Sequence, residues 1–347
     1  MLLDKDMLQA LLDALPEPVL VIRADGRVLA VNAPGRALFP SMRAGDLLAL
    51  NLRSPVVLDA IARVRAQGRA EAVTWLDRVP VERLFDVNIA MLAAPGDPDT
   101  IVLTLRDTTE VRRVERMRVD FIANASHELR TPLASLLGFV ETLQGAARED
   151  VRAREKFLAI MHEQARRMAR LVDDLLSLSR IEQNQHVRPD APVDLAIIVR
   201  HISDTLARMA RDNKVTLDMR ASEEVVVPGD RDDLLRVAEN LIENAIKYAP
   251  PPEGGVQVPV EISVTKSGRK AVFRVRDHGP GIAPEHLPRL TERFYRIDAG
   301  QSRARGGTGL GLAIVKHIVA RHRGHLQIDS TPGEGAAFTV VLPLYEG

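Results

Sequence analysis

Residues 121–133 read FIANASHELRTPL, and the interpretation of the whole chain starts from this stretch. Apolar residues recur at steps of three and four positions along residues 114–143, which predicts a long amphipathic helix. His127 lies two residues from Ala125 and from Leu129 in the apolar seam, about 200° around the helix. Its side chain is therefore predicted to point outward. Most exposed helical histidines are simple surface residues, so the neighbours of His127 decide its meaning.

Three of those neighbours supply chemistry. Glu128 can accept the Nδ1 proton of the imidazole and leave Nε2 more nucleophilic, which is base-assisted activation of a nucleophile. Thr131 lies one turn further on the same face, where its hydroxyl can orient a water molecule. Pro132 has no amide hydrogen, so the Glu128 carbonyl loses its helical partner and the helix can bend there. The candidate catalytic residues are His127, Glu128 and Thr131.

A second apolar seam follows along residues 157–178, after a polar link at residues 145–150. Two amphipathic helices joined by a short link predict an antiparallel helical hairpin. A single hairpin of this kind leaves its apolar stripe exposed to water. We therefore expect a homodimer, in which two copies of the chain form a four-helix bundle.

The part of the chain before the hairpin alternates short apolar runs with turn residues. The pattern predicts a helix at 54–67, a loop at 94–99 and strands at 19–22, 27–31, 70–75, 83–91 and 100–106. These elements indicate a small α+β domain built on an antiparallel sheet. Phe39, Trp75 and Phe85 are expected in its core rather than around a cofactor.

The part after the hairpin alternates helical and strand-like segments. Helices are predicted at 200–213, 231–248 and 309–321, and strands at 258–266, 270–276, 326–330 and 337–342. This order predicts an α/β sandwich with its helices on one face. The chain is therefore expected to be multidomain, with an α+β domain at 8–107, the hairpin at 108–183, a linker at 184–193 and the sandwich at 194–347.

Residues 239–248, ENLIENAIKY, carry side chains suited to a nucleotide. Asn240 and Asn244 are four residues apart and share one helix face, where their amide oxygens suit a hydrated Mg²⁺ between phosphates. Lys247 offers positive charge to phosphates, and Tyr248 offers a flat surface to a base. A polar helix face is the alternative explanation for any one of these residues.

Two glycine-rich stretches complete the set. In DHGPGI, Asp277 follows a strand and can accept a hydrogen bond from the amine of adenine, while Gly279 and Gly281 permit a tight turn. In GGTGLGL, glycine-rich backbone at the start of a helix predicts a phosphate cradle. The candidate residues there are Gly307, Thr308, Gly309, Leu310 and Gly311. The chain has no GxxxxGK[ST] motif and no strand followed by GxGxxG, so an ATP site in it must have another design.

The order of these motifs, with ERFYR at 292–296 before the last, resembles the sensor histidine kinases of two-component systems over residues 110–347. The hairpin sequence is most similar to the phosphate-regulon sensor branch. The resemblance implies that ATP phosphorylates His127, which passes the phosphoryl group to an aspartate in the receiver domain of a response regulator. It also implies regulator phosphatase activity and a role in phosphate-starvation signalling.

The resemblance further implies roles for single residues. Mg²⁺ would bind Asn244, assisted by Asn240, and ATP would meet Lys247, Asp277 and the glycines of the last motif. Residues 283–306 would form a mobile lid over ATP, with Phe294 as its apolar anchor and with Arg303 and Arg305 able to meet the γ-phosphate.

The first domain resembles a PAS sensor domain, with Asp107-Thr108-Thr109-Glu110 before the signalling helix. His127 is the first histidine, and the chain has no cysteine, so this domain has no histidine for haem and no cysteine for flavin photochemistry. An upstream regulatory protein or a small metabolite is the expected partner of this domain.

Composition limits the partners. Lysine plus arginine equals aspartate plus glutamate at 47 each, so we expect no general attraction to nucleic acid or anionic lipid. No run of ~18 apolar residues is present, so no membrane segment is expected in this chain. The expected location is cytoplasmic; a membrane-anchored parent trimmed at its start would give the same sequence.

Two other functions are compatible with parts of this pattern. A gyrase-type ATPase resembles this site but carries a glutamate base four residues before the Mg²⁺ asparagine, and Asn240 stands at that position. A catalytically inactive scaffold would not need His127, Glu128, Asn244 and Asp277 together.

Overall fold

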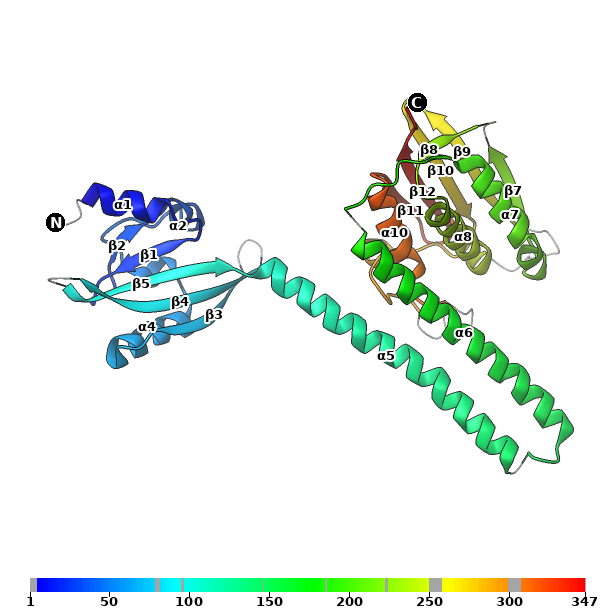
Figure 1. Cartoon of the computed structure of the whole chain (residues 1–347), viewed down its shortest axis with the longest axis horizontal. Coiled ribbons are helices and arrows are strands. Elements are labelled where there is room, and N and C mark those ends of the chain that lie inside the picture. Colours follow the sequence, from blue (N-terminus) through cyan, green and yellow to red (C-terminus); the bar gives the residue numbers. More distant parts are fainter. Residues whose placement is uncertain are drawn as a thin grey trace. The chain divides into compact units, whose positions relative to one another are not determined.

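The structure is a computed structural model that describes residues 5–78, 82–94, 97–145, 147–184, 186–221, 224–249, 258–298 and 307–346. The chain divides into two compact units, Met1–Asp120 and Phe121–Gly347 (Figure 1). In the second unit the hairpin and the C-terminal sandwich pack together. Among the described residues, no helix is both long and apolar enough to cross a bilayer.

The first unit is built on a five-stranded sheet in the order β2-β1-β5-β4-β3, with all neighbouring strands antiparallel. The strands are β1 (Val19–Ile22), β2 (Val28–Val31), β3 (Glu71–Asp77), β4 (Arg83–Ala94) and β5 (Asp97–Asp107). The helices are α1 (Lys5–Asp13), α2 (Ala33–Leu38), α3 (Leu48–Asn51) and α4 (Pro55–Gln67). The loop predicted at 94–99 is wrong, because Ala94 pairs with Asp97 and the two long strands form a hairpin there.

The aromatic residues of the first unit lie in its core, as predicted. Trp75 stacks between Phe39 and Phe85, with ring centroids 6.0 Å and 5.2 Å away, and all three side chains are buried. Helix α4 begins where Ser54 accepts a hydrogen bond from the Val57 amide and ends at Gly68 in the left-handed conformation. The described part of this unit therefore has an aromatic core.

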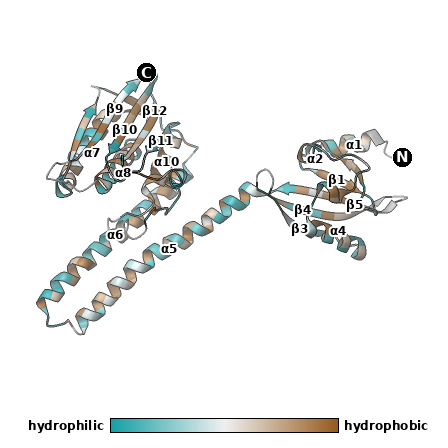
Figure 2. Cartoon of the chain, turned by 180° about the vertical axis from the view of Figure 1, so that it is seen from behind, coloured by the Kyte–Doolittle hydropathy of each residue, from teal (hydrophilic) through white to brown (hydrophobic). Residues whose placement is uncertain are grey.

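The hairpin consists of α5 (Thr109–Gln144) and α6 (Val151–Gln183), as the two apolar seams predict. Asp150 caps α6 by accepting a hydrogen bond from the Ala153 amide, and Phe139 stacks on Phe157 with ring centroids 5.1 Å apart. Helix α5 continues through Pro132. Apolar and polar residues alternate along both helices (Figure 2), as expected for elements that bury only one face.

The C-terminal sandwich has a five-stranded sheet in the order β11-β12-β10-β9-β7, in which only β7 and β9 are parallel. Its strands are β7 (Val215–Ala221), β9 (Val258–Ser267), β10 (Lys270–Asp277), β11 (His325–Ser330) and β12 (Ala336–Pro343). Its helices are α7 (Leu195–Asp212), α8 (Arg231–Tyr248) and α10 (Gly311–Arg321), with a short 3-10 helix η2 (Leu287–Arg289). Strands β6 (Pro192–Asp194) and β8 (Val226–Pro228) form a separate pair.

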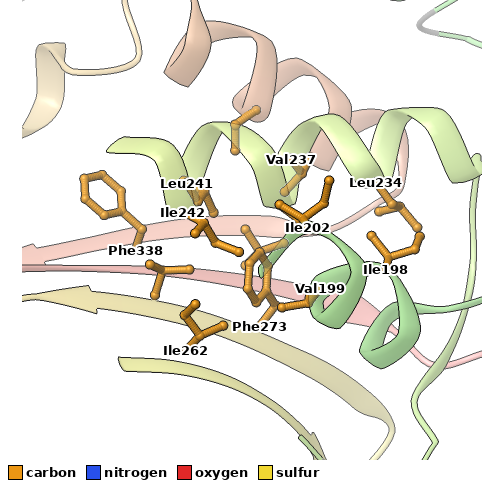
Figure 3. Packing of buried hydrophobic residues seen from close by; sticks show 14 of the residues in the cluster. Ile198, Val199, Ile202, Leu234, Val237, Leu241, Ile242, Ile262, Phe273 and Phe338 are labelled. Atoms are coloured by element: carbon orange, nitrogen blue, oxygen red, sulfur yellow. The ribbon is translucent and has the colours of Figure 1, made fainter. Parts of the chain in front are cut away.

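The helices pack on one face of this sheet through an apolar core (Figure 3). Phe273 of β10 is fully buried among side chains of α7 and α8 such as Val199 and Ile242. Truncating a buried phenylalanine of this kind to alanine costs about 3–5 kcal/mol. The same core includes Leu171 and Leu178 of α6, so the second half of α6 is held against the sandwich.

Candidate nucleotide and phosphoacceptor site

Helix α8 positions the asparagines. It begins at Asp230, whose side chain accepts hydrogen bonds from the amides of Asp232 and Asp233. Its apolar residues are buried against the sheet, so its polar residues face the other way. Asn240 and Asn244 consequently line a cavity of about 830 Å³.

The amide of Asn240 is oriented by two contacts. Its Nδ2 donates to the Arg236 carbonyl at 2.8 Å, which leaves Oδ1 as the free acceptor end of the amide. Gly311, at the start of α10, lies so close to that oxygen that a Cβ there would collide with it. Glycine at position 311 therefore allows the glycine-rich loop and the asparagine pair to share one cavity wall.

Lys247 and Tyr248 also line the cavity, and Lys247 has a partner within the same motif. Its ammonium lies 2.8 Å from a carboxylate oxygen of Glu243, one turn earlier on α8. The i,i+4 spacing of a glutamate before a lysine is the sequence signal that predicts such a pair.

Asp277 ends strand β10 and is almost fully buried. Its Oδ1 accepts hydrogen bonds from the amides of Gly279 at 2.9 Å and Ala336 at 3.3 Å. Burial raises the pKa of the Asp277 carboxyl, and the two amides offset part of this rise. Gly281 has a φ of 69°, and a Cβ there would also collide with the Thr331 carbonyl, so the turn after Asp277 requires glycine.

The glycine-rich loop supplies four of its five predicted residues to the cavity. Gly307, Thr308, Gly309 and Gly311 line it. The prediction that Leu310 binds nucleotide is not supported by its position, because its side chain is fully buried in the apolar core. Leucine at this position anchors the loop to the core instead.

The loop also forms a hydrogen bond with the hairpin. The Thr308 hydroxyl donates to Asp174 Oδ2 of α6 at 2.8 Å. Burial raises the pKa of Asp174, while this hydrogen bond and the charge of Arg236 lower it. A carboxylate of the hairpin therefore lies at the phosphate-binding loop predicted from the sequence.

The segment predicted as a lid is described up to residue 298 and again from residue 307. The Phe294 amide donates to the Gly309 carbonyl at 2.8 Å. The centroid of the Phe294 ring lies 5.8 Å from that of the Phe121 ring of α5. Arg293 forms an ion pair with Glu182 at the end of α6. Arg303 and Arg305, predicted to meet the γ-phosphate, lie outside the described residues.

His127 is exposed on α5, as predicted, and is not among the residues that line the cavity. The Thr131 hydroxyl donates to the His127 carbonyl at 3.2 Å. The Glu128 carboxylate lies 3.1 Å from Arg167 of α6 and 3.2 Å from Arg296, just after Phe294. Glu128, the predicted base, thus forms ion pairs with two guanidinium groups.

Several cavity residues were missed by the motifs. Arg236, Glu239 and Glu243 are within one turn of the two asparagines on α8, so helical spacing could have found them. Others come from α6 and from the segment before the glycine-rich loop. Only tertiary packing brings Arg170 and Asp174 of α6 and Arg296 of that segment to the cavity.

Comparison with known proteins agrees with this arrangement. Residues 117–184 match the His Kinase A (phospho-acceptor) domain, and residues 229–346 match the histidine kinase-, DNA gyrase B- and HSP90-like ATPase. A phosphoacceptor hairpin joined to an ATPase-type domain is the arrangement of a histidine kinase. The chain belongs to the sensor histidine kinases of two-component systems and is a protein-histidine kinase that uses ATP.

Individual relatives support this assignment. The chain is 36% identical to the phosphate regulon sensor protein PhoR of Pseudomonas aeruginosa over 96% of its own length and 74% of the relative. It is 30% identical to the sensor protein kinase WalK of Staphylococcus aureus over 98% of this chain and 55% of the relative. The solved structure of the histidine kinase AdeS of Acinetobacter baumannii is 26% identical, with a TM-score of 0.50, over 63% of this chain and 98% of that chain.

Proposed function

We propose that His127 is the phosphoacceptor and that it passes its phosphoryl group to an aspartate in a response-regulator receiver domain. The observation that supports this most is the cavity where Asn240, Asn244, Asp277 and the glycine-rich loop meet, in the same unit as the exposed His127. In the transfer, Nε2 of His127 attacks the γ-phosphorus in line while the bond to the β–γ bridging oxygen breaks. Glu128 takes the Nδ1 proton, for which its carboxylate must leave Arg167 and Arg296.

The residues present fit Mg²⁺ held together with nucleotide. Among the residues described by the structure, no three His, Cys, Asp or Glu side chains are grouped to hold a metal. Asn240 and Asn244 line the cavity and carry amide oxygens, and Mg²⁺ is usually held by a few protein oxygens, waters and substrate phosphates. When bound, the ion would neutralise phosphate charge, and Asp277 would accept a hydrogen bond from adenine.

A second copy of this chain is the proposed partner of the hairpin. Several apolar side chains of α5 and α6 are exposed to solvent. They include Val114, Met117, Ile122, Leu133 and Leu137 of α5 and Leu158, Val172 and Leu176 of α6. Pairing two hairpins into a four-helix bundle would bury such a stripe.

The first unit is proposed as a PAS-like sensor domain that receives an upstream protein or small ligand. Its antiparallel order β2-β1-β5-β4-β3 and its position directly before α5 support this proposal. The likeness to a phosphate regulon sensor supports phosphate-starvation signalling as the pathway.

One assay separates this proposal from an ATPase and from an inactive scaffold. The chain is incubated with Mg²⁺ and ATP labelled at the γ-phosphate, and label is followed on the protein and in solution. We expect acid-labile label on the protein, lost in His127→Gln while ATP binding is kept. Release of free phosphate without labelled protein would identify an ATPase, and neither product would identify a scaffold.

A further inference from the structure

Helix α8 brings one cation to the cavity that none of the motifs accounts for. Arg236 lies one turn before Asn240 and two turns before Asn244, so these side chains share a face. Arg236 lines the cavity, and its Nη1 atom is buried without a hydrogen-bond partner among the described residues. Buried N–H groups without acceptors are rare in folded proteins, so this guanidinium is suited to an acceptor that a ligand brings.

The charges around Arg236 distinguish it from Lys247. Lys247 is held by Glu243 at 2.8 Å, so its charge is already compensated. Burial raises the pKa of both Asp174 and Glu239, and the charge of Arg236 lowers both, so Arg236 acts on these carboxylates through space. Within the described part of the chain, Arg236 Nη1 donates no hydrogen bond to either carboxylate.

The direction of α8 indicates which part of a nucleotide would reach Arg236. The Asp277 turn lies at the C-terminal end of the helix, where Gly279 packs against the Tyr248 carbonyl. Arg236 lies about 18 Å from Tyr248 along the helix axis, beyond both asparagines. With adenine at Asp277 and Mg²⁺ at the asparagines, the phosphate chain runs toward Arg236.

We propose that Arg236 binds the terminal phosphate of ATP, an inference that rests on the proposed function of the cavity. The planar fork of a guanidinium can donate two hydrogen bonds to one phosphate group. Arg236 would then hold the group that His127 receives, at the end of the cavity lined by α6. The competing explanation is that Arg236 only compensates the charges of Asp174 and Glu239.

Nucleotide discrimination separates the two explanations. The full chain carrying His127→Gln, which prevents transfer, is titrated calorimetrically with ATP, ADP and adenosine in the presence of Mg²⁺. Adding Arg236→Gln should weaken ATP binding at least about tenfold, ADP binding less than about threefold and adenosine binding not at all. Arg231→Gln, at an exposed position on the same helix, is the control and should change none of them.

Equal changes in ATP and ADP binding, or no change in either, would overturn the proposal. If Arg236→Gln does not fold, Arg236→Lys retains the charge but loses the fork, and the ratio of ATP to ADP affinity should fall at least about threefold. An unchanged ratio in that variant would equally overturn it. A His127→Gln chain that bound no ATP at all would instead contradict the proposed function.

Discussion

The Glu128 carboxylate, next to the histidine, forms an ion pair with Arg296, two residues after Phe294. Both Arg296 terminal nitrogens donate to it, at 3.3 Å and 3.2 Å, and only 6% of the Arg296 side chain is exposed. A carboxylate bound in this way is not free to take a proton from His127. In the described structure, the sandwich therefore holds Glu128, the predicted catalytic base on the hairpin, through Arg296.

This pair should be strongly coupled. A double-mutant cycle with Glu128→Gln and Arg296→Gln should give an interaction of about 1–3 kcal/mol, because removing the Glu128 charge leaves the almost fully buried Arg296 guanidinium without its carboxylate. Glu110 and Arg113 on α5 form an exposed pair, with 79% and 68% of their side chains accessible, and their cycle should give about 0–1 kcal/mol. Urea unfolding of the full chain followed by circular dichroism measures both. Equal couplings would show that the buried pair contributes nothing specific.

Thr131 should support dephosphorylation of the regulator rather than labelling of His127. Its hydroxyl is exposed and bonds only the His127 carbonyl in the described structure, so Thr131→Ala should change the unfolding free energy by less than about 0.5 kcal/mol. Labelling should persist, while loss of phosphate from the regulator slows at least about tenfold. Thr142→Ala removes an equivalent bond, to the Gly138 carbonyl, and should affect neither activity. Equal loss of both activities in Thr131→Ala would indicate a structural role.

The face of α5 below His127 is predicted to receive the regulator. Ala134 and Gly138 are exposed, and a Cβ at Gly138 would meet nothing within 4 Å among the described atoms. Crowding beside Phe139 within the hairpin therefore does not explain this glycine. Combined Gly138→Arg and Ala134→Arg should leave the dimer and His127 labelling intact and slow transfer at least about tenfold, or 1.4 kcal/mol.

Gly138→Ala is the matched control for this surface. It should raise stability by up to about 1 kcal/mol and leave transfer unchanged, since alanine favours helix and remains small. Unchanged transfer in the double arginine variant would place the docking surface elsewhere, and loss of the dimer would indicate that this face packs against the second copy.

Replacing Asp277 with asparagine should have opposite effects on nucleotide binding and on stability. Asp277→Asn keeps an acceptor for the Gly279 and Ala336 amides but removes the buried charge, so ATP binding should weaken at least about tenfold while the nucleotide-free protein is stabilised. Because the folded pKa of Asp277 is raised, the native state of the natural protein binds more protons and loses stability as pH rises through that pKa. The advantage of the variant should therefore be largest at neutral pH and shrink on acidification. Thermal unfolding between pH 4 and about pH 7 tests this; an advantage independent of pH would contradict it.

The elements that sequence predicts well have local signals. Helix α8 has the predicted bounds because Asp230 caps it and its apolar residues repeat regularly. Helix α7 begins at Leu195, earlier than predicted. Asp194 caps it, and residues 195–199 are all apolar and so show no helical periodicity. Strand β7 was not predicted, although Val215, Leu217 and Met219 alternate with polar residues, which is the pattern of a half-buried strand.

The residues of the site also divide into those with a local sequence signal and those without one. Asn240, Asn244 and Asp277 follow from residue chemistry and spacing within one element. Asp174 and Arg296 act across elements far apart in sequence, and no local pattern reveals such partners. The burial of the Leu310 side chain could not be predicted, because a motif does not distinguish backbone that lines a cavity from a side chain that fills a core.

The contact between Gly311 and the Asn240 amide has a consequence for engineering chimaeric kinases. Because the Gly311 backbone occupies the space beside Asn240 Oδ1, α8 and the start of α10 form one interlocking part. Exchanging either segment alone with that of a distant relative would replace only one side of this contact. Exchanges that carry both segments together should preserve the cavity wall, so the sandwich from α8 to α10 is the smallest segment to exchange.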